Sequence, residues 1–190
     1  MSAPPPPASS AFSLPTLRLP KTLEADGTGA PLLAALRQNV RKLWSGGAIE
    51  VPVSAWSQGL ASALTLAERE GHLVQGLEQA EKTLVQHARG VALADARSGA
   101  ERGARVSRLL VVGNDGTERF YRQAERLVTL HAPRVLPLWI DAGSEQLASV
   151  LPRAGGIVRA LLIEHKDSVA RVLRALYPGA ADGGEREPRP

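Results

Sequence analysis

The segment RLLVVGNDGTERFYRQAERLVTLHAPRVLPLWID, from Arg108 to Asp141, holds two apolar runs of strand length with a helix-like segment between them. A third apolar run, VRALLIEH, follows at residues 158–165. Each run is followed by a segment with helical spacing, at residues 118–131, 145–151 and 167–176. Strands that alternate with helices in this way are typical of a sheet that helices cover on both faces. The sequence therefore predicts the α/β class and a three-layer α/β/α sandwich.

Upstream of this region the sequence predicts three helices and two short extended pieces. The helices cover residues 30–44, the segment from a cap at Ser54 to about Arg69, and the segment from Leu77 to about Arg89; the extended pieces are AIEVPV, residues 48–53, and HLV, residues 72–74. Ser54 is predicted to cap the second helix because a serine hydroxyl can accept a hydrogen bond from the first turn of a helix. Residues 90–104, GVALADARSGAERGA, lack strong periodicity and are interpreted as a loop or an insertion.

The two ends of the chain differ in composition from its middle. Residues 1–28 hold many prolines and few large apolar side chains, and the tail at residues 178–190 is similar. Such segments bury too little apolar surface to offset the entropy of ordering, so both are predicted to be disordered. Between them we expect a helical extension over residues 29–56 and a principal domain over residues 57–177.

Composition limits the classes of function. The 190 residues carry a formal net charge of +4 and a pI of about 10.0, which permits an acidic partner such as RNA. The sequence has no cysteine, which excludes disulfides and thiolate metal sites. It shows no secretion signal at its start and no apolar run near the roughly 18 residues of a membrane span. We expect a cytoplasmic protein without membrane contact, and no DNA partner is predicted.

One segment has the position of a phosphate loop. VVGNDGTERF, residues 111–120, places two glycines between a strand and a helix. It lacks the full G-x-G-x-x-G spacing and the lysine of a Walker motif, so nucleotide binding is weakly indicated. A turn between strand and helix, with Asp115 or Thr117 as the helix cap, explains the same residues.

Metal and catalytic chemistry find little support in the sequence. The four histidines, His72, His87, His131 and His165, lack the spacing of zinc ligands. Glu164, His165 and Asp167 lie together at a predicted strand end, where enzymes often hold catalytic groups. Because no nucleophile or oxyanion donor is identifiable nearby, we interpret them as polar residues that end a buried strand. The sequence therefore predicts no enzyme, no metal site and no cofactor.

The order of elements from Ser57 to Leu176 carries a family resemblance. ALTLAEREGHLVQG, residues 63–76, leads into a predicted helix, and strands and helices then alternate to residue 176. In order and in wording this region resembles the kink-turn-binding ribosomal protein family, especially its bacterial members YlxQ and YbxF. The preceding GTGAPLLAALRQNVRKLWSGGAIEVP, residues 27–52, resembles the end of YlxR proteins, which are small RNA-associated domains. The resemblance implies a noncatalytic RNA-binding protein of the ribosome or another ribonucleoprotein, with structured RNA such as ribosomal RNA as its partner.

The same resemblance implies where RNA would bind. The family's glycine, polar position and lysine are matched by Gly76, Gln79 and Lys82. A helix start offers unpaired N–H groups, and glycine lets the backbone approach a phosphate closely. Glutamine can bond a base edge while lysine neutralises a phosphate. Arg119 and Arg122, early in the next predicted helix, are expected to support the RNA backbone.

Two departures from the family keep a second hypothesis open. Glu78 stands where the family carries Asn or Lys, and LASVLP, residues 147–152, replaces a glycine-containing loop that packs on the RNA. A carboxylate repels phosphate, and the loss of glycine stiffens a loop. The alternative is a protein-interaction module that keeps the fold without RNA binding, with a possible protein partner at Val150, Leu151 and Ile157.

Overall fold

The computed structural model describes residues 12–98, 105–152 and 156–177, and contains a six-stranded mixed sheet in the order β1-β2-β5-β4-β6-β3. The strands are β1 (Val40–Lys42), β2 (Glu50–Ala55), β3 (Leu73–Gln75), β4 (Arg108–Val112), β5 (Val135–Asp141) and β6 (Ala160–Ile163). Strands β2, β5 and β4 run parallel, whereas β1 is antiparallel to β2, and β6 is antiparallel to both β4 and β3.

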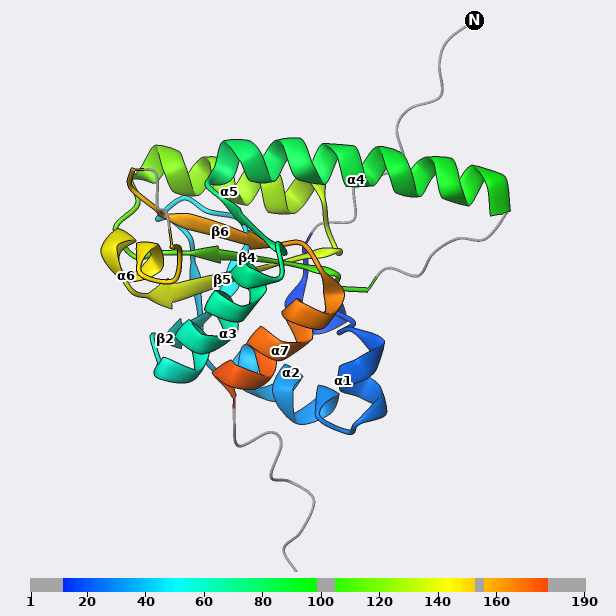
Figure 1. Ribbon diagram of the computed structural model, residues 1–190, viewed down its shortest axis with the longest axis horizontal. Coiled ribbons are helices and arrows are strands. Elements are labelled where there is room, and N and C mark those ends of the chain that lie inside the picture. Colours follow the sequence, from blue (N-terminus) through cyan, green and yellow to red (C-terminus); the bar gives the residue numbers. More distant parts are fainter. Residues whose placement is uncertain (1–11, 99–104, 153–155, 178–190) are drawn as a thin grey trace, which may run out of the picture.

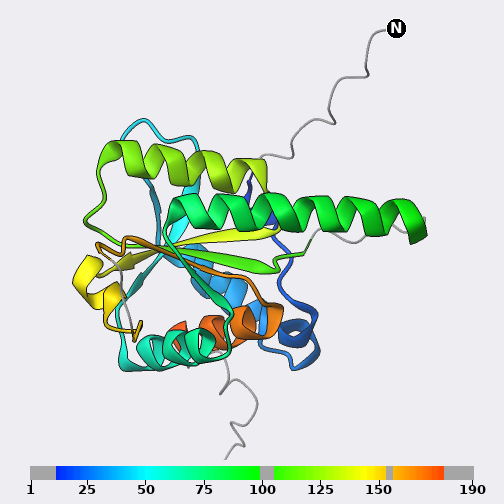
Figure 2. The same cartoon turned by 45° about the horizontal axis from the view of Figure 1, so that its top comes forward.

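Helices cover both faces of the sheet. After a 3-10 turn, η1 (Leu14–Thr16), they are α1 (Lys21–Ala25), α2 (Gly29–Gln38), α3 (Gln58–Arg69), α4 (Leu77–Ser98), α5 (Glu118–Leu130), α6 (Ser144–Ala148) and α7 (Lys166–Leu176). Figures 1 and 2 show α4 and α5 on one face and α1, α2, α3 and α7 on the other. The predicted three-layer α/β/α sandwich is confirmed. None of the helices in the described residues is long and apolar enough to cross a membrane.

The three apolar runs form the centre of the sheet. Every residue from Val135 to Ile140 in β5 is buried, as are residues 109–112 in β4 and 160–163 in β6. Burial on both faces explains why these runs are continuously apolar rather than alternating. Thr117 caps α5 as expected, because its hydroxyl accepts a hydrogen bond from Phe120 N at 3.3 Å. The strand, helix and strand predicted from this part of the sequence are confirmed.

The predicted disordered arm is wrong over residues 12–28. This segment forms η1 and α1, and five of its large apolar side chains are buried: Phe12, Leu14, Leu17, Leu19 and Leu23. They join the same hydrophobic core as the central strands, and Val106 N donates to Arg18 O at 2.8 Å. The burial of these apolar side chains offsets the entropy cost of ordering the segment. The proline content of the segment gave no sign of this burial. Residues 1–11 and the predicted tail at 178–190 lie outside the described residues.

The predicted extension, residues 29–56, is built into the sheet. Helix α2 ends at Gln38, and Val40–Lys42 then form β1, so the helix predicted over 30–44 is too long. β1 pairs with β2, and Val53 of β2 lies opposite Trp139 of β5. Ser54 lies within β2 and therefore caps no helix; Ser57 caps α3 instead, accepting from Leu60 N at 3.1 Å.

Helix α4 is longer than predicted. It continues to Ser98, so the loop interpretation is wrong for residues 90–98; residues 99–104 lie outside the described residues. The segment contains no proline, and its alanines and Leu93 favour a helix, so the single Gly90 does not end it. The second half of α4 projects beyond the sheet (Figures 1 and 2).

Candidate nucleic-acid interface

The turn into α4 is built around Gly76. Its φ of +80° lies in the left-handed region that glycine adopts without strain, and nothing lies within 4 Å of the position a Cβ would occupy. Its N–H donates to Ala160 O of β6 at 2.9 Å, and its carbonyl accepts from Ala80 N at 3.1 Å. The first turn of α4 is thus fixed to the sheet while the outer side of Gly76 stays open.

Gln79 and Lys82 follow on the first two turns of α4, and both are exposed. The Lys82 ammonium donates to the Glu78 carboxylate at 2.8 Å, in a pair one helical turn apart whose two side chains are well exposed. The hydrogen bond and the attraction of Lys82 lower the pKa of Glu78. Lys82 therefore has an anionic partner in the free protein, and a phosphate would compete with Glu78 for it.

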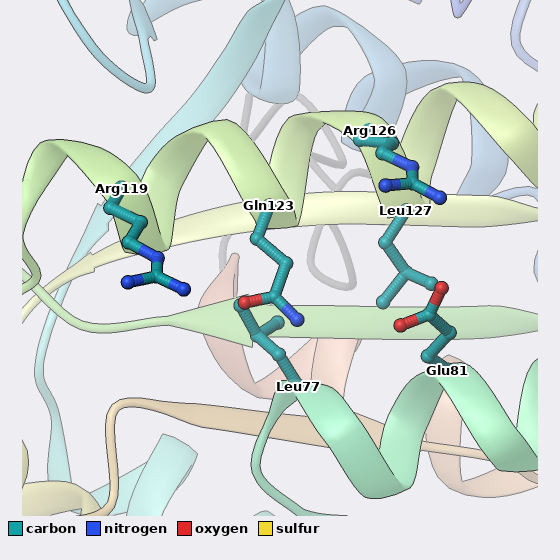
Figure 3. A pocket seen from close by; sticks show the side chains of 6 residues that line it. All are labelled: Leu77, Glu81, Arg119, Gln123, Arg126 and Leu127. Carbon is teal, nitrogen blue, oxygen red and sulfur yellow. The ribbon is translucent and has the colours of Figure 1, made fainter.

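A groove of about 270 Å³ lies between α4 and α5, next to the start of α4. Its lining residues are Leu77, Glu81, Arg119, Gln123, Arg126 and Leu127 (Figure 3). Figure 3 shows Arg119 and Gln123 pointing from α5 toward Leu77, with Arg126 farther along the same helix. Among the described residues, neither Arg119 nor Arg126 forms a salt bridge; both are exposed. The groove thus offers two available guanidinium groups.

The predicted site residues fall into two places. Gly76, Gln79 and Lys82 lie at the start of α4, and Arg119 lies across the groove from Leu77. Arg122 instead pairs with Glu118 and stacks over the Trp44 ring, with its guanidinium carbon 4.4 Å from the ring centroid. Arg122 therefore contacts the turn after β1 rather than the groove.

Two of the residues that line the groove are not among the site residues predicted from the sequence. Gln123 and Arg126 follow Arg119 by four and seven residues, the spacing at which side chains share one face of a helix. That spacing was visible in ERFYRQAER, and it marks a polar stripe on α5 that faces α4. Glu81 adds one carboxylate to the same groove.

The glycine loop after β4 is a structural turn. Gly113 N donates to Arg159 O, Asn114 N donates to Ala142 O, and Gly116 N donates to the Tyr121 hydroxyl at 3.0 Å. A Cβ on Gly113 would lie 2.9 Å from Ala142 O, so close packing accounts for this glycine. With its N–H groups engaged in this way, the loop has few donors to offer a phosphate.

Polar residues around the end of β6 and the start of α7 link α7 to the end of α3. Ser168, which is 1% exposed, donates to Glu70 at 3.0 Å, and the His72 Nδ1 atom lies 2.9 Å from the same hydroxyl. Glu70 also lies on Nδ1 of His72, at 3.3 Å, whereas a catalytic triad places nucleophile and carboxylate on opposite ring nitrogens. His165 stacks on His72 and caps α7. This cluster serves packing between α3 and α7.

The predicted protein contact surface near the start of β6 is only partly available. Val150 is 3% exposed and belongs to the core, so that part of the prediction is wrong. Leu151 is half-buried, while Ile157 is 67% exposed. Ile157 remains as a single exposed apolar side chain, which is an ordinary feature of soluble surfaces.

Comparisons with known proteins leave the family open. No protein-family model matches this chain, and neither does any curated protein. Among solved structures, the chain is similar to a protein of unknown function from Bacillus halodurans, with 15% sequence identity and a TM-score of 0.40. That similarity covers 61% of this chain and 98% of the other.

Proposed function

We propose that this protein is a noncatalytic RNA-binding protein, associated with a ribosome or another ribonucleoprotein in the cytoplasm. It recognises structured RNA of the kink-turn kind at the start of α4. The observation that carries the proposal is the open, left-handed Gly76 at the beginning of a 22-residue helix, with Gln79 and Lys82 exposed on its first two turns. The family resemblance from Ser57 to Leu176 supports the same proposal.

The groove beside α4 gives the RNA a second contact. Arg119 and Arg126 form no salt bridge within the described residues, so phosphate can bind them without displacing a protein carboxylate. Gln123 between them can accept and donate hydrogen bonds to a base or a ribose. In this proposal the RNA lies along the mouth of the groove between α4 and α5, where it contacts Gly76 and Arg119.

Lys82 contributes through an exchange of partners. In the free protein its ammonium bonds Glu78, and on binding it would turn to a phosphate. An exposed pair of this kind contributes little to stability, so a phosphate contact offsets its loss. The Glu78 carboxylate that is left near the RNA and the Glu81 carboxylate in the groove are then the unfavourable features of the site.

The test compares a labelled kink-turn RNA with a plain duplex of equal length, at about 50 and 200 mM salt, where nonspecific binding falls steeply. A kink-turn preference that persists at the higher salt is expected. Lys82→Ala should weaken binding and reduce the salt slope by about 1, while Gln79→Ala should reduce the preference for the kink-turn. Lys166→Ala, at an exposed lysine on the opposite face of the sheet, is the control. Equal affinity for the two RNAs, or unchanged binding in both site variants, would refute the proposal.

The second candidate is a protein-interaction module, and one apolar groove favours it. This groove, of about 310 Å³, lies between the middle of α4 and the end of α5. Its apolar lining includes Leu84, Val91 and Leu130, and Arg108 and Arg134 also line it. Leu130 is 59% exposed, and Leu93 on α4 is 62% exposed. The two candidates differ in a simple measurement: RNA binding depends on Lys82, whereas association through this groove would depend on Leu130, with Leu130→Glu abolishing it.

A further inference from the structure

An open hollow lies beside β1 and the turn that follows it, which contains Trp44. Trp139 of β5 also lines the hollow. The hollow measures about 560 Å³ and is lined by Asn39, Arg41, Lys42, Trp44, Ser45, Val53 and Trp139. Its floor is the row formed by Val53 of β2 opposite Trp139 of β5. Two of the chain's three tryptophans therefore line one hollow, although they are 95 residues apart in the sequence.

Trp44 is held in a fixed position. Its indole N–H donates to one oxygen of Glu125 on α5, and the other oxygen accepts from Ala48 N at 2.6 Å and Ile49 N at 3.1 Å. The guanidinium of Arg122 lies over the ring. The carboxylate of Glu125 is thus engaged by three donors, and the aromatic surface of Trp44 is preorganised.

Trp139 forms the second aromatic surface. The guanidinium carbon of Arg41 lies 4.1 Å from its ring centroid, and the side chain as a whole is 8% exposed. Its buried indole N–H has no acceptor among the described residues, whereas buried polar groups are normally paired. Arg41 is an exposed residue on an edge strand, so it can move outward and uncover the ring.

The charge of the hollow favours an anionic ligand. Its lining contains two cations, Arg41 and Lys42, and no carboxylate. Asn39 and Ser45 add neutral polar groups. Aromatic rings, guanidinium planes and cations together form the surface on which proteins stack the bases and hold the phosphates of single-stranded nucleic acid. A peptide without acidic residues would leave the two cations without a counter-charge.

We propose that this hollow binds unpaired nucleotides of an RNA strand. When Arg41 moves outward, a base takes its place on the Trp139 ring beside Trp44, and Arg41 and Lys42 contact the flanking phosphates. The inference rests on the proposed RNA binding and extends it. Arg122, which lies over Trp44, is one helical turn from Arg119 of the α4 and α5 groove, so the two sites are neighbours on α5. A strand that leaves structured RNA at the α4 groove can therefore cross the start of α5 into the hollow.

The experiment uses three RNAs: a blunt kink-turn, the same kink-turn with a single-stranded extension of ten uridines, and free ten-uridine RNA. The full chain should bind the extended RNA about tenfold more tightly than the blunt one, because stacking of one or two bases has about this effect. Arg41→Glu should remove this increment and leave the affinity for the blunt RNA unchanged. Arg69→Glu, which reverses an exposed arginine at the end of α3 on the opposite face, should leave the increment intact.

Tryptophan fluorescence reports the stacking directly. In a Trp56→Phe background, all tryptophan emission comes from Trp44 and Trp139, so added ten-uridine RNA should quench it. If the emission does not change and the single-stranded extension adds no affinity, the proposal for the hollow is wrong; this is also the result expected if the hollow binds a peptide.

If the blunt kink-turn binds no more tightly than the duplex, the function proposed for α4 is wrong. In that case, quenching by free ten-uridine RNA still tests the hollow independently.

Discussion

The Glu78 carboxylate lies 2.8 Å from the Lys82 ammonium, so the acid at the start of α4 is paired with the lysine that the family resemblance assigns to RNA. Both side chains are exposed, at 84% and 59%, which leaves the pair open to competition from phosphate. The pair therefore explains how an acid can stand at the start of α4 without excluding an anionic ligand, and it predicts that the acid weakens binding.

Glu78→Gln should strengthen RNA binding. The substitution frees Lys82 and removes a charge that repels phosphate. We expect about a fivefold lower Kd, measured by titration with the kink-turn RNA at low salt. Glu68→Gln, on α3 across the sheet, should leave the Kd unchanged. A weaker or equal affinity in Glu78→Gln would contradict a phosphate contact by Lys82.

Gly76→Ala should lower the stability of the protein. An alanine at a φ of +80° is strained although its Cβ has space, and the strain costs about 1 kcal/mol. Gly90, within α4, also has nothing within 4 Å of a Cβ, but its backbone is helical. Gly90→Ala should therefore stabilise the helix, by up to about 1 kcal/mol. Urea unfolding followed by circular dichroism should show the two substitutions moving the midpoint in opposite directions; a shared direction would argue against the left-handed turn at Gly76.

Leu19→Ala should destabilise the whole protein. Leu19 is completely buried, in a segment whose prolines predicted disorder, and removing a buried leucine side chain typically costs about 2–5 kcal/mol. Leu93→Ala, at a side chain that is 62% exposed, is the matched control and should change the free energy of unfolding little. If Leu19→Ala had no greater effect than Leu93→Ala, residues 12–28 would not belong to the core.

The elements predicted most accurately are those whose pattern is local. β4, β5 and α5 follow from continuous apolar runs and from a helical stripe capped by Thr117, and each depends on neighbouring residues. Leu19 and Leu23 have no such pattern, because their burial depends on a core formed by distant strands. β1 has only three residues and exists because β2 pairs with it. Elements that are stabilised mainly by tertiary contacts could not be recognised from propensity.

The candidate site shows the same division. Gly76, Gln79 and Lys82 come from one continuous segment, so their proximity could be predicted. The groove partner Arg119 was found only as an early helix residue, and the stacking of Arg122 on Trp44 depends on a contact between residues 78 positions apart. Such pairings follow from the packing of α5 against the Trp44 turn, which no local pattern reports.

Acid should weaken the link between α3 and α7. Hydrogen bonds from Arg171 and from Ser168 lower the pKa of Glu70 from 4.5 to about 2. Because the folded pKa lies below the unfolded one, the carboxylate's contribution to stability is fully present above about pH 4.5 and is lost as the pH falls toward 2. Thermal unfolding of the wild type and of Glu70→Gln between pH 7 and pH 2 measures this contribution.

The gap between the two melting temperatures should be largest at neutral pH and should close as the pH falls from 4.5 to about 2. Glu145→Gln, at an exposed carboxylate on α6 that forms no salt bridge among the described residues, should run parallel to the wild type throughout. A gap for Glu70→Gln that stayed constant with pH would mean that the Glu70 and Arg171 pair does not form in solution. Of the two arginines of α7, Arg174 would then be the one that forms an ion pair, with Asp26 beside α1.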